Sequence, residues 1–257
     1  SELREDYPNT RFGQWFLDPL NKKGPDYERN KKRIMDKIDV VDASFLTTSP
    51  DALNFLNNKN CFYIPNPSDS SFEILNNYQN PCNVDVFFAL SHGVHRGVLK
   101  TGKTDDRITF LNKLVSTTPD IKFDIYGIKK IQPIWADHYF KTIQNAKMGL
   151  NLSRGDAIKY YSSDRITQIV GNGLVCLIDE KTQYNNFFNS NEMVFYKNIK
   201  DLSEKIIKIS KDEKLRKKIG MNGKIKYMKY FNSDLVAQYI INKTLEINTK
   251  NKEFWEK

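Results

Sequence analysis

Apolar runs with the character of β-strands alternate with helix-like segments through the middle of the chain. The runs lie at residues 84–90, 121–126, 148–152, 174–178 and 193–196, and the helix-like segments between them at about 106–117, 137–146, 164–172 and 183–189. Strands that alternate with helices predict a parallel sheet covered by helices on both faces. Residues 174–178 are continuously apolar, which is typical of a strand buried on both sides.

Separate strands and helices are expected before and after this alternating region. Short strands are expected at 12–17, 43–48 and 62–64, with helices at 26–38 and 50–56. Residues 65–83 are rich in Pro, Asn and Ser and predict a linker. Further on, the patterns Asp201-x-x-Glu204 and Ser210-x-x-Glu213 are capping boxes that indicate helix starts. The pair Asn222-Gly223 indicates a break in the second of these helices, and a last helix is expected at about 233–247.

The composition is that of a globular protein. Of 257 residues, 39% are hydrophobic and 28% are charged. No stretch approaches the roughly 20 apolar residues of a membrane span, and the first residues lack the basic start and apolar run of a secretory signal. Cys61, Cys82 and Cys176 are widely spaced, which argues against a disulfide scaffold and a cysteine zinc site. A reducing, cytoplasmic setting is therefore expected.

The net charge of +9 is concentrated at the C-terminal end. Residues 197–257 hold 16 Lys and Arg against 8 Asp and Glu, whereas residues 1–196 hold 24 against 23. The lysines alternate with an apolar stripe, so they form the polar side of amphipathic helices. We interpret this side as a solvated basic face in preference to a nucleic-acid site. Peripheral contact with an anionic membrane surface is the second interpretation.

The segment 147–180 carries the strongest chemical signal. Its first strand leads through a polar loop to a helix that begins near Arg165, and a helix N-terminus at the carboxyl end of a strand suits a phosphate group. Arg154 and Lys159 add cations to this region. The alternative is that Ser163 or Asp164 merely caps the helix and that the cations are solvated.

A second polar loop follows the strand at 84–90. It contains Ser91, His92, Gly93, His95 and Arg96, which combine donors for a phosphate or a sugar with a glycine that permits close backbone approach. Since both loops follow strands of one predicted sheet, we expect them to face the same crevice. The alternative is an ordinary polar loop in which a histidine bonds to the backbone.

Several other site classes are excluded or disfavoured by the sequence. His138 is expected to begin a helix capped by Asp137, and no His-x-Glu or His-x-x-x-His pair indicates a metal site. The chain has no Gly-x-x-x-x-Gly-Lys-Ser/Thr loop, no strand followed by Gly-x-Gly-x-x-Gly and no Gly-x-Ser-x-Gly elbow. A P-loop nucleotide hydrolase, a dinucleotide-binding enzyme of the usual pattern and a serine hydrolase are therefore disfavoured.

The order of these motifs resembles the C-terminal half of GT-B glycosyltransferases, and most closely the spore-maturation-protein-like group. The resemblance rests on 148–154, on the pattern Arg165-x-x-Gln168 within 163–179, and on 191–196 and 215–223. Upstream, residues 42–49 and 63–67 are similar to the end of an N-terminal GT-B domain and its linker. Individually the motifs are loose, but their order along residues 40–235 is specific.

The resemblance implies an α/β fold, with a Rossmann-like parallel sheet covered by helices on both faces and a partial N-terminal α/β segment. Residues 1–67 would be a remnant of the N-terminal domain and the start of the linker, and 68–235 the nucleotide-sugar-binding domain. Residues 236–257 would form a C-terminal helix that packs back on the N-terminal part. A full GT-B enzyme is longer, so the resemblance implies an N-terminally truncated enzyme or a reduced homologue.

The implied activity is transfer of a sugar, as in hexosyltransferases, from a nucleotide diphosphate sugar to a glycan, lipid-linked or other acceptor. Bacterial cell-surface polysaccharide synthesis is the implied context, with no metal or other cofactor and no nucleic-acid partner. Gln168 would hold the donor ribose, Tyr126 and Gly127 would lie beside the base, and the loop after Gly127 would meet it. His92 and His95 are the catalytic candidates. The donor diphosphate would be bound by Ser91, His92, Gly93, His95, Arg96, Arg154, Lys159, Ser163 and Arg165.

The chain departs from the family pattern at two acidic positions. Gln168 stands where the family has the glutamate that holds the ribose, and the second glutamate of the retaining signature would fall near Tyr160. Retaining chemistry therefore does not follow from the resemblance. A non-catalytic nucleotide- or sugar-binding module derived from a GT-B domain is the alternative function.

Overall fold

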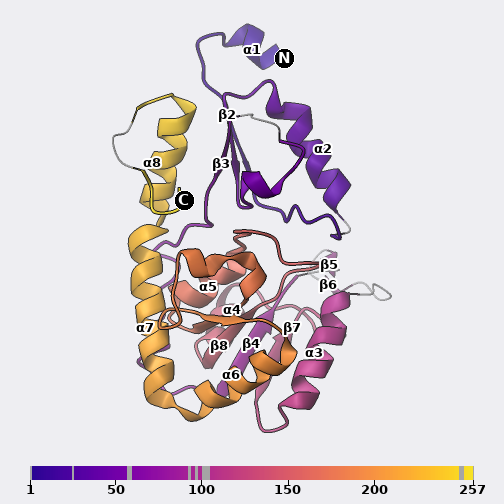
Figure 1. Cartoon of the computed structure of the whole chain (residues 1–257), viewed down its shortest axis with the longest axis vertical. Helices are drawn as coiled ribbons and strands as arrows, with labels where there is room; N and C mark the ends of the chain where they lie inside the picture. Colours follow the sequence, from indigo (N-terminus) through magenta and orange to yellow (C-terminus); the bar gives the residue numbers. More distant parts are fainter. Residues whose placement is uncertain are drawn as a thin grey trace.

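The protein contains two parallel β-sheets, one above the other in Figure 1. The computed structural model describes residues 2–24, 26–56, 60–91, 94–95, 98–99, 105–248 and 252–256. At Leu3, Val94, His95, Val98 and Leu99 it describes the backbone only. The predicted fold class, a Rossmann-like parallel sheet with helices on both faces and a partial N-terminal α/β segment, is confirmed.

The smaller sheet is built from the first 63 residues. Its strands β1 (Gly13–Phe16), β2 (Ala43–Leu46) and β3 (Cys61–Tyr63) are parallel and adjacent in that order. Helix α2 (Tyr27–Ile38) connects β1 to β2 and buries Ile34 and Ile38 against Leu46. A short helix α1 (Glu2–Asp6) precedes β1.

The larger sheet has five parallel strands in the order β10-β9-β8-β4-β7. These strands are β4 (Val84–Ala89), β7 (Phe123–Tyr126), β8 (Ala146–Asn151), β9 (Val175–Asp179) and β10 (Val194–Tyr196). Between β4 and β7, the two-residue strands β5 (Val94–His95) and β6 (Val98–Leu99) pair with each other.

Helices cover both faces of this sheet. On one face, α3 (Asp106–Thr117) and α6 (Ile199–Lys211) pack in a cluster with Phe88, Leu150 and Leu177. On the other, α4 (Ala136–Ile143), α5 (Asp164–Gly171) and α7 (Glu213–Tyr230) pack in a cluster with Phe87 and Cys176. The alternation of faces along β4 explains why neighbouring phenylalanines belong to different clusters.

The strand order creates a topological switch point between β4 and β8. The chain passes from β4 to β7 on one side and then returns across β4 to β8 on the other. Loops after adjacent strands therefore diverge at the carboxyl ends of β4 and β8, which leaves a crevice there. Residues 89–91 and 153–154 lie at this edge.

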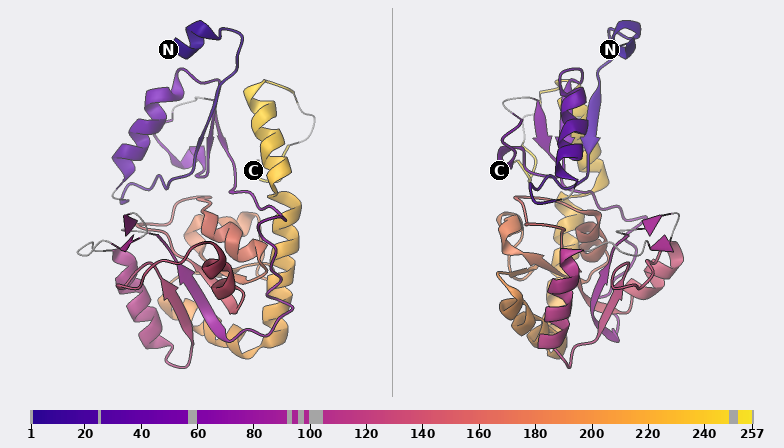
Figure 2. Two further views of the ribbon diagram at one scale, coloured as in Figure 1. Left: turned by 180° about the vertical axis from the view of Figure 1, so that it is seen from behind. Right: turned by 90° about the vertical axis from the view of Figure 1, so that its right-hand side faces the viewer.

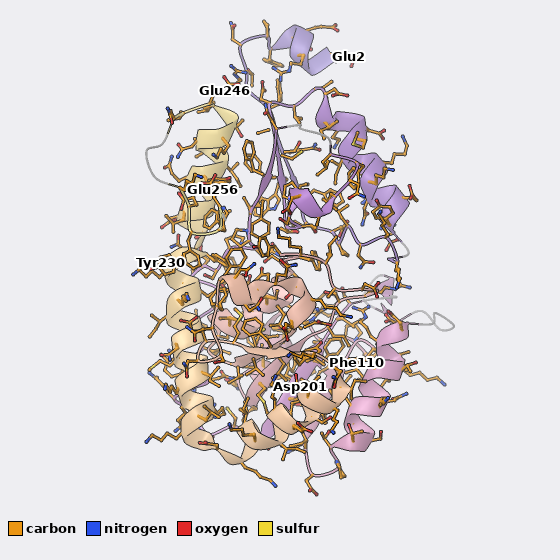
Figure 3. The ribbon with its side chains drawn as sticks, viewed as in Figure 1. Glu2, Phe110, Asp201, Tyr230, Glu246 and Glu256 are labelled. Atoms are coloured by element: carbon orange, nitrogen blue, oxygen red, sulfur yellow. The ribbon has the colours of Figure 1, made fainter. Side chains whose placement is uncertain are left out.

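The C-terminal helices connect the two sheets. Helix α7 runs along the larger sheet, and α8 (Ser233–Thr244) lies beside the smaller one (Figures 1 and 2). The Tyr239 ring of α8 packs edge-on against Phe45 and Phe62. Figure 3 labels Tyr230 and Glu256, which anchor the chain end: Tyr230 stacks on Phe254, and Glu256 accepts a hydrogen bond from Tyr239.

Asn66 in the linker forms hydrogen bonds to residues of α5 and α7 and to Ser162 before α5. Its backbone N–H donates to Ser162 Oγ at 2.9 Å, and its carbonyl accepts from Thr167 on α5 and Tyr227 on α7. Its side-chain amide donates to the Ser162 carbonyl at 2.9 Å. The linker is thus held on the face that carries α5.

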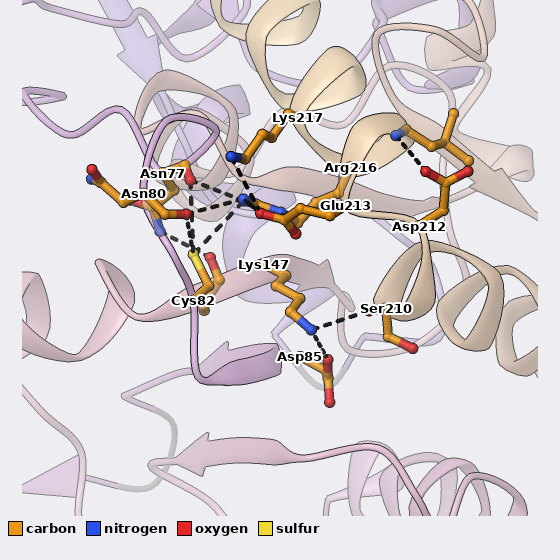
Figure 4. A network of polar contacts seen from close by, with 12 residues as sticks. Asn77, Asn80, Cys82, Asp85, Lys147, Ser210, Asp212, Glu213, Arg216 and Lys217 are labelled. Carbon is orange, nitrogen blue, oxygen red and sulfur yellow. Dashed lines mark hydrogen bonds and ion pairs between the residues drawn. The ribbon is translucent and has the colours of Figure 1, made fainter.

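Arg216 of α7 fixes the far end of the linker (Figure 4). Its side chain is 1% exposed and donates to the carbonyls of Asn77 and Asn80 at 2.9 and 3.0 Å and to Glu213 at 2.5 and 2.8 Å. A buried guanidinium needs these acceptors because burying a charge without partners is costly. These bonds therefore hold the end of the linker in one conformation, although the linker has no regular secondary structure.

We expect Arg216→Met to lower the free energy of unfolding by about 3 kcal/mol, because it removes the buried guanidinium that bonds both linker carbonyls and leaves the carbonyl of buried Asn77 with only the longer bonds from Asn80 and Cys82. The neighbouring Lys217 is exposed and lies 3.6 Å from Glu213, so Lys217→Met is the matched control and should change stability little. Urea unfolding of both variants measures the difference. Equal unfolding midpoints for the two variants would show that the linker contacts are not what stabilises this region.

Three expected local features are wrong. Residues 183–189 form no α-helix; the 3-10 turns Glu180–Thr182 and Tyr184–Asn186 flank Gln183, whose φ of +56° interrupts a helix. Residues 50–56 contain only the turn Pro50–Ala52. Helix α7 continues through Asn222-Gly223, because Gly223 allows close approach to the Glu192 carbonyl rather than a break.

The helix starts also differ from the predicted ones. Asn198 and Asp212, and not the two capping boxes, cap α6 and α7 through bonds to the backbone of Asp201 and Leu215. Asp137 does not cap α4, whose first residue is Ala136. The division of the chain at residues 67 and 235 stays a prediction.

Cys61, Cys82 and Cys176 form no disulfide bond in the structure. In the part of the chain that the structure describes, no helix has the length and apolar character needed to cross a bilayer.

Candidate functional site

A cleft of about 670 Å³ opens at the switch point between β4 and β8. Its walls come from regions distant in the sequence: the segment before α2, the linker, the end of β4, the start of α3, α4 with the loop before it, and α5 with the loop that joins it to β8. Ser91 and Arg154, expected from the sequence to face one crevice, both line it. The two strand-end loops therefore converge as predicted.

The N-terminus of α5 points its first amides into this region without a side-chain cap. Ser163 occupies the N-cap position, but its hydroxyl donates to Asn151 Oδ1 at 2.9 Å instead of accepting from the helix. Among the described residues, none bonds to the amides of Asp164 and Arg165. The alternative in which Ser163 or Asp164 caps this helix is therefore wrong, and the helix start is open to an anion.

Arg165 is held beside these amides. Its Nε donates to the Ala89 carbonyl at 3.2 Å, its Nη1 lies 3.4 Å from Asn151 Oδ1, and its guanidinium lies over the Phe88 ring. Burial, and next the charge of Arg107, lower the pKa of Arg165 below its ordinary value. Burial and the nearby positive charge disfavour the charged form of Arg165. An anionic ligand would stabilise that form, because it supplies a negative charge that the protein does not.

Arg107 was not expected from the sequence. It lies in the first turn of α3, is 7% exposed, and bonds Asp105 through Nε and Nη2 at 2.9 and 2.7 Å. It lines the same cleft as Arg165 and Arg154. The signal that points to it is its place at the start of the helix that follows the loop after β4, the same connection that contains Ser91.

One part of the cleft wall is apolar. Pro133, Ile134 and Trp135, from the loop after Gly127, line it, and Trp135 is 53% exposed. A flat exposed indole suits stacking against a planar ring. The loop after Gly127 therefore does reach the cleft, whereas Tyr126 packs against Phe87 and His138 and is not part of the lining.

Gln168 of α5 also lines the cleft. It lies one turn after Asp164, and its Oε1 accepts a hydrogen bond from the hydroxyl of Tyr139 at 2.7 Å. This bond orients the amide so that its Nε2 remains a donor. Tyr139 belongs to α4 and was not expected from the sequence.

The linker adds Phe72 and Glu73 to the cleft. Phe72 is 67% exposed and Glu73 is 8% exposed. Burial raises the pKa of Glu73 above its ordinary value, and the charge of Asp69 adds to the shift, while backbone hydrogen bonds and Lys224 oppose it. No motif marks these residues, because the linker carries no periodic pattern.

Several predicted donor-binding residues are not brought together here. Lys159 forms an ion pair with Asp51 and lies 4.9 Å from the Tyr160 ring centroid, outside the cleft lining, because Asp51 offers it a nearby carboxylate. His92, Gly93 and Arg96 lie outside the described residues, as does the side chain of His95.

Gly127 shows why a glycine occurs at the end of β7. Its φ is +76°, and a Cβ there would lie 1.5 Å from the carbonyl oxygen of Leu90. Only glycine permits this close approach of the loops after β4 and β7. Gly127 itself is not part of the cleft lining, and its role beside the nucleotide base stays a prediction.

Metal binding has no evident support in the described part of the chain. No group of three or more His, Cys, Asp and Glu side chains lies there in a position to hold a metal ion. The charge available to a ligand in the cleft comes from arginines and from the helix terminus.

Comparison with protein families identifies a relationship over the larger sheet. Residues 107–242, more than half of the chain, match the family model described as glycosyl transferase-like. A search of curated proteins found no significant match.

Solved structures share the fold. TarM of S. aureus superposes with a TM-score of 0.64 at 15% identity, over 92% of this chain and 50% of TarM. HepE of Anabaena, solved with UDP and glucose, gives 0.66 at 8% identity, over 95% of this chain and 74% of HepE. Sucrose-phosphate synthase of Thermosynechococcus elongatus gives 0.60 at 12% identity, over 96% and 70%. The chain thus spans about half the length of TarM.

Proposed function

The chain belongs to the glycosyl transferase-like family, and on that premise we propose that it transfers a sugar from a nucleoside diphosphate sugar to an acceptor. The observation that carries the proposal is the uncapped N-terminus of α5 beside Arg165, at the switch point of the sheet. A helix N-terminus and a guanidinium stabilise the diphosphate as its charge develops on leaving. This step requires no metal.

The proposed pose follows the cleft from the charged end to the apolar end. The diphosphate lies at the amides of Asp164 and Arg165, with Arg154 and Arg107 adding positive charge. The base stacks against Trp135, and the ribose lies between them near Gln168. HepE and a TarM variant were solved with UDP, which supports a uridine diphosphate as the first ligand to try.

We propose the spore-maturation-protein-like group and hexosyl transfer as the finer assignment, with a glycan or lipid-linked acceptor in cell-surface polysaccharide synthesis. The order of the sequence motifs from 148 to 223 supports it. His92 and His95 stay the candidates for a catalytic role.

The test is a melting-temperature panel with UDP, GDP, dTDP, CMP and ADP. A ligand present at 100 times its dissociation constant adds about 2.7 kcal/mol of stability. We expect one diphosphate to raise the melting temperature and thereby to name the base. No shift with any of the five would overturn the proposed donor site.

A non-catalytic binding module is the second candidate, because Gln168 and Tyr160 stand at positions where the family has acids. An assay of nucleotide release from a nucleotide sugar separates the two functions. It uses UDP-glucose, or the sugar nucleotide whose diphosphate binds in the panel. Binding without any release, in the presence of varied acceptors, favours the module. Release that depends on an added acceptor favours the transferase.

We further propose peripheral contact with an anionic membrane at the cytoplasmic side through one face of α7. Lys214, Lys217, Lys218, Met221 and Ile225 are exposed and recur at helical spacing, so they share this face. Ile225 is 57% exposed, although it is apolar. Basic side chains around exposed apolar ones suit the surface of anionic lipid.

We expect the triple change Lys214→Gln, Lys217→Gln and Lys218→Gln to weaken binding to vesicles of phosphatidylglycerol and phosphatidylcholine about 100-fold, since each lysine contributes about 1 kcal/mol near such a surface. Co-sedimentation measures the partition. The control removes three exposed lysines elsewhere, Lys22, Lys37 and Lys122. Equal losses in both triples would mean that net charge, and not this face, governs binding.

A further inference from the structure

Glu73 is a nearly buried carboxylate that the linker places in the wall of the cleft. Its Oε2 accepts the backbone N–H of Asp69 at 2.7 Å, the carboxylate also accepts its own backbone N–H, and no side chain of another described residue donates a hydrogen bond to it. A carboxylate has about four acceptor sites, so about half of its capacity is unused. Burial raises its pKa, which means that the ionised form lacks the donors that water would give.

The carboxylate side chain lies over the last turn of α5. A Cβ at Gly171 would lie 2.3 Å from the Cγ of Glu73, so the absence of a side chain at 171 makes room for it. Gly171 follows Asp164 by seven residues, which is about 10 Å along a helix. Burial, above all, raises the pKa of Tyr139, and the charge of Glu73 adds to the shift, so Glu73 also lies near the partner of Gln168.

Asp164, Gln168 and Asn172 all line the cleft, so Glu73 lies at the same face of α5 as Gln168. In the proposed pose, with the phosphates at the first amides and the base at Trp135, the ribose lies near Gln168 on this face. A ribose presents two adjacent hydroxyls, each of which can donate one hydrogen bond and accept another.

We infer that Glu73 accepts hydrogen bonds from the 2′- and 3′-hydroxyls of the donor ribose, and that it supplies the carboxylate which Gln168 lacks. Gln168 complements Glu73. Because the Oε1 of Gln168 accepts from Tyr139, its Nε2 donates to a ribose hydroxyl, and that hydroxyl in turn donates a hydrogen bond to Glu73. The inference rests on the proposed nucleotide site. It assigns discrimination of the sugar hydroxyls to a linker residue outside every sequence motif.

The experiment compares UDP with 2′,3′-dideoxy-UDP, or the same pair with the base that the panel selects, by calorimetric titration. For the wild-type chain we expect UDP to bind at least tenfold more tightly. In Glu73→Gln, UDP affinity is expected to fall about tenfold while that of the dideoxy analogue changes less than twofold. The glutamine keeps an acceptor for Asp69 and a similar shape, so a merely structural role would weaken both ligands alike.

The control is Glu28→Gln, an exposed glutamate of α2, which should leave both affinities unchanged. Retention of the full preference for UDP in Glu73→Gln overturns this inference and leaves the nucleotide site intact. Equal loss of both ligands also overturns it, because Glu73 would then act only on the fold. Failure of the wild-type chain to bind any nucleotide overturns the inference and the proposed function together.

Discussion

Arg165→Ala is expected to weaken binding of the nucleoside diphosphate at least 100-fold, which corresponds to about 2.7 kcal/mol. The guanidinium lies beside the open amides of α5, and a hydrogen bond to a charged group contributes about 1.5 to 3 kcal/mol. Titration calorimetry with UDP, or the base selected by the panel, measures the change. Arg165→Lys should give an intermediate loss, since a lysine keeps the charge but not the planar donor geometry.

A loss of folding must be separated from a loss of binding, because Arg165 also bonds Ala89 and lies near Asn151. The melting temperature of each variant without ligand provides that check. Arg33→Ala, on an exposed part of α2, is the matched control for removal of a guanidinium. If Arg165→Ala folds and binds the diphosphate as the wild type does, the assignment of the diphosphate site is wrong.

Gly127→Ala is expected to lower the free energy of unfolding by about 4 kcal/mol. The new Cβ would lie 1.5 Å from the Leu90 carbonyl oxygen, and a φ of +76° is itself unfavourable for alanine. The position of the Cβ is fixed by the backbone and the carbonyl oxygen is a backbone atom, so no side-chain rotation relieves the clash. The apolar wall of the cleft should shift with the loop, and nucleotide binding should fall too.

Gly13→Ala provides the contrast. A Cβ at residue 13 would meet the Thr244 hydroxyl at 3.0 Å, and that side chain can rotate. We expect a change below about 1 kcal/mol there, in line with mild overpacking. Urea unfolding of both variants measures the difference. A Gly127→Ala chain as stable as Gly13→Ala would mean that the loops after β4 and β7 move apart without cost.

The alternating part of the fold is predictable from sequence because each element carries its own signal. The helix expected at 106–117 occurs at those residues, and the strand expected at 174–178 is displaced by one residue. Apolar runs and helical periodicity arise from burial, which operates on every element of the larger sheet.

The predictions that failed depended on backbone conformation or on tertiary contacts. A glycine at 223 has the same local signal whether it breaks a helix or, as here, admits a carbonyl from a neighbouring loop. The left-handed conformation of Gln183 has no marker in the sequence. The capping boxes failed because Asn198 and Asp212 are also good caps, and only the packed structure selects between them.

The residues of the candidate site also fall into a group that the sequence indicates and a group that it does not. Ser91, Arg154, Ser163 and Arg165 follow strand ends, so the rule for open parallel sheets was enough to find them. Arg107, Tyr139 and Glu73 reach the cleft from α3, α4 and the linker, and their sequence neighbours carry no common motif. Lys159 has the right position in the sequence, but Asp51, more than a hundred residues earlier, binds it.

The most direct test of the donor site is a crystal structure of the chain with UDP, or with the diphosphate that the panel selects. We predict phosphate oxygens at about 3 Å from the Arg165 guanidinium and from the amides of Asp164 and Arg165. A second basic groove, between α3 and α6, is lined by Lys113, Lys197 and Lys200. A nucleotide bound in that groove, with the start of α5 unoccupied, would contradict the account.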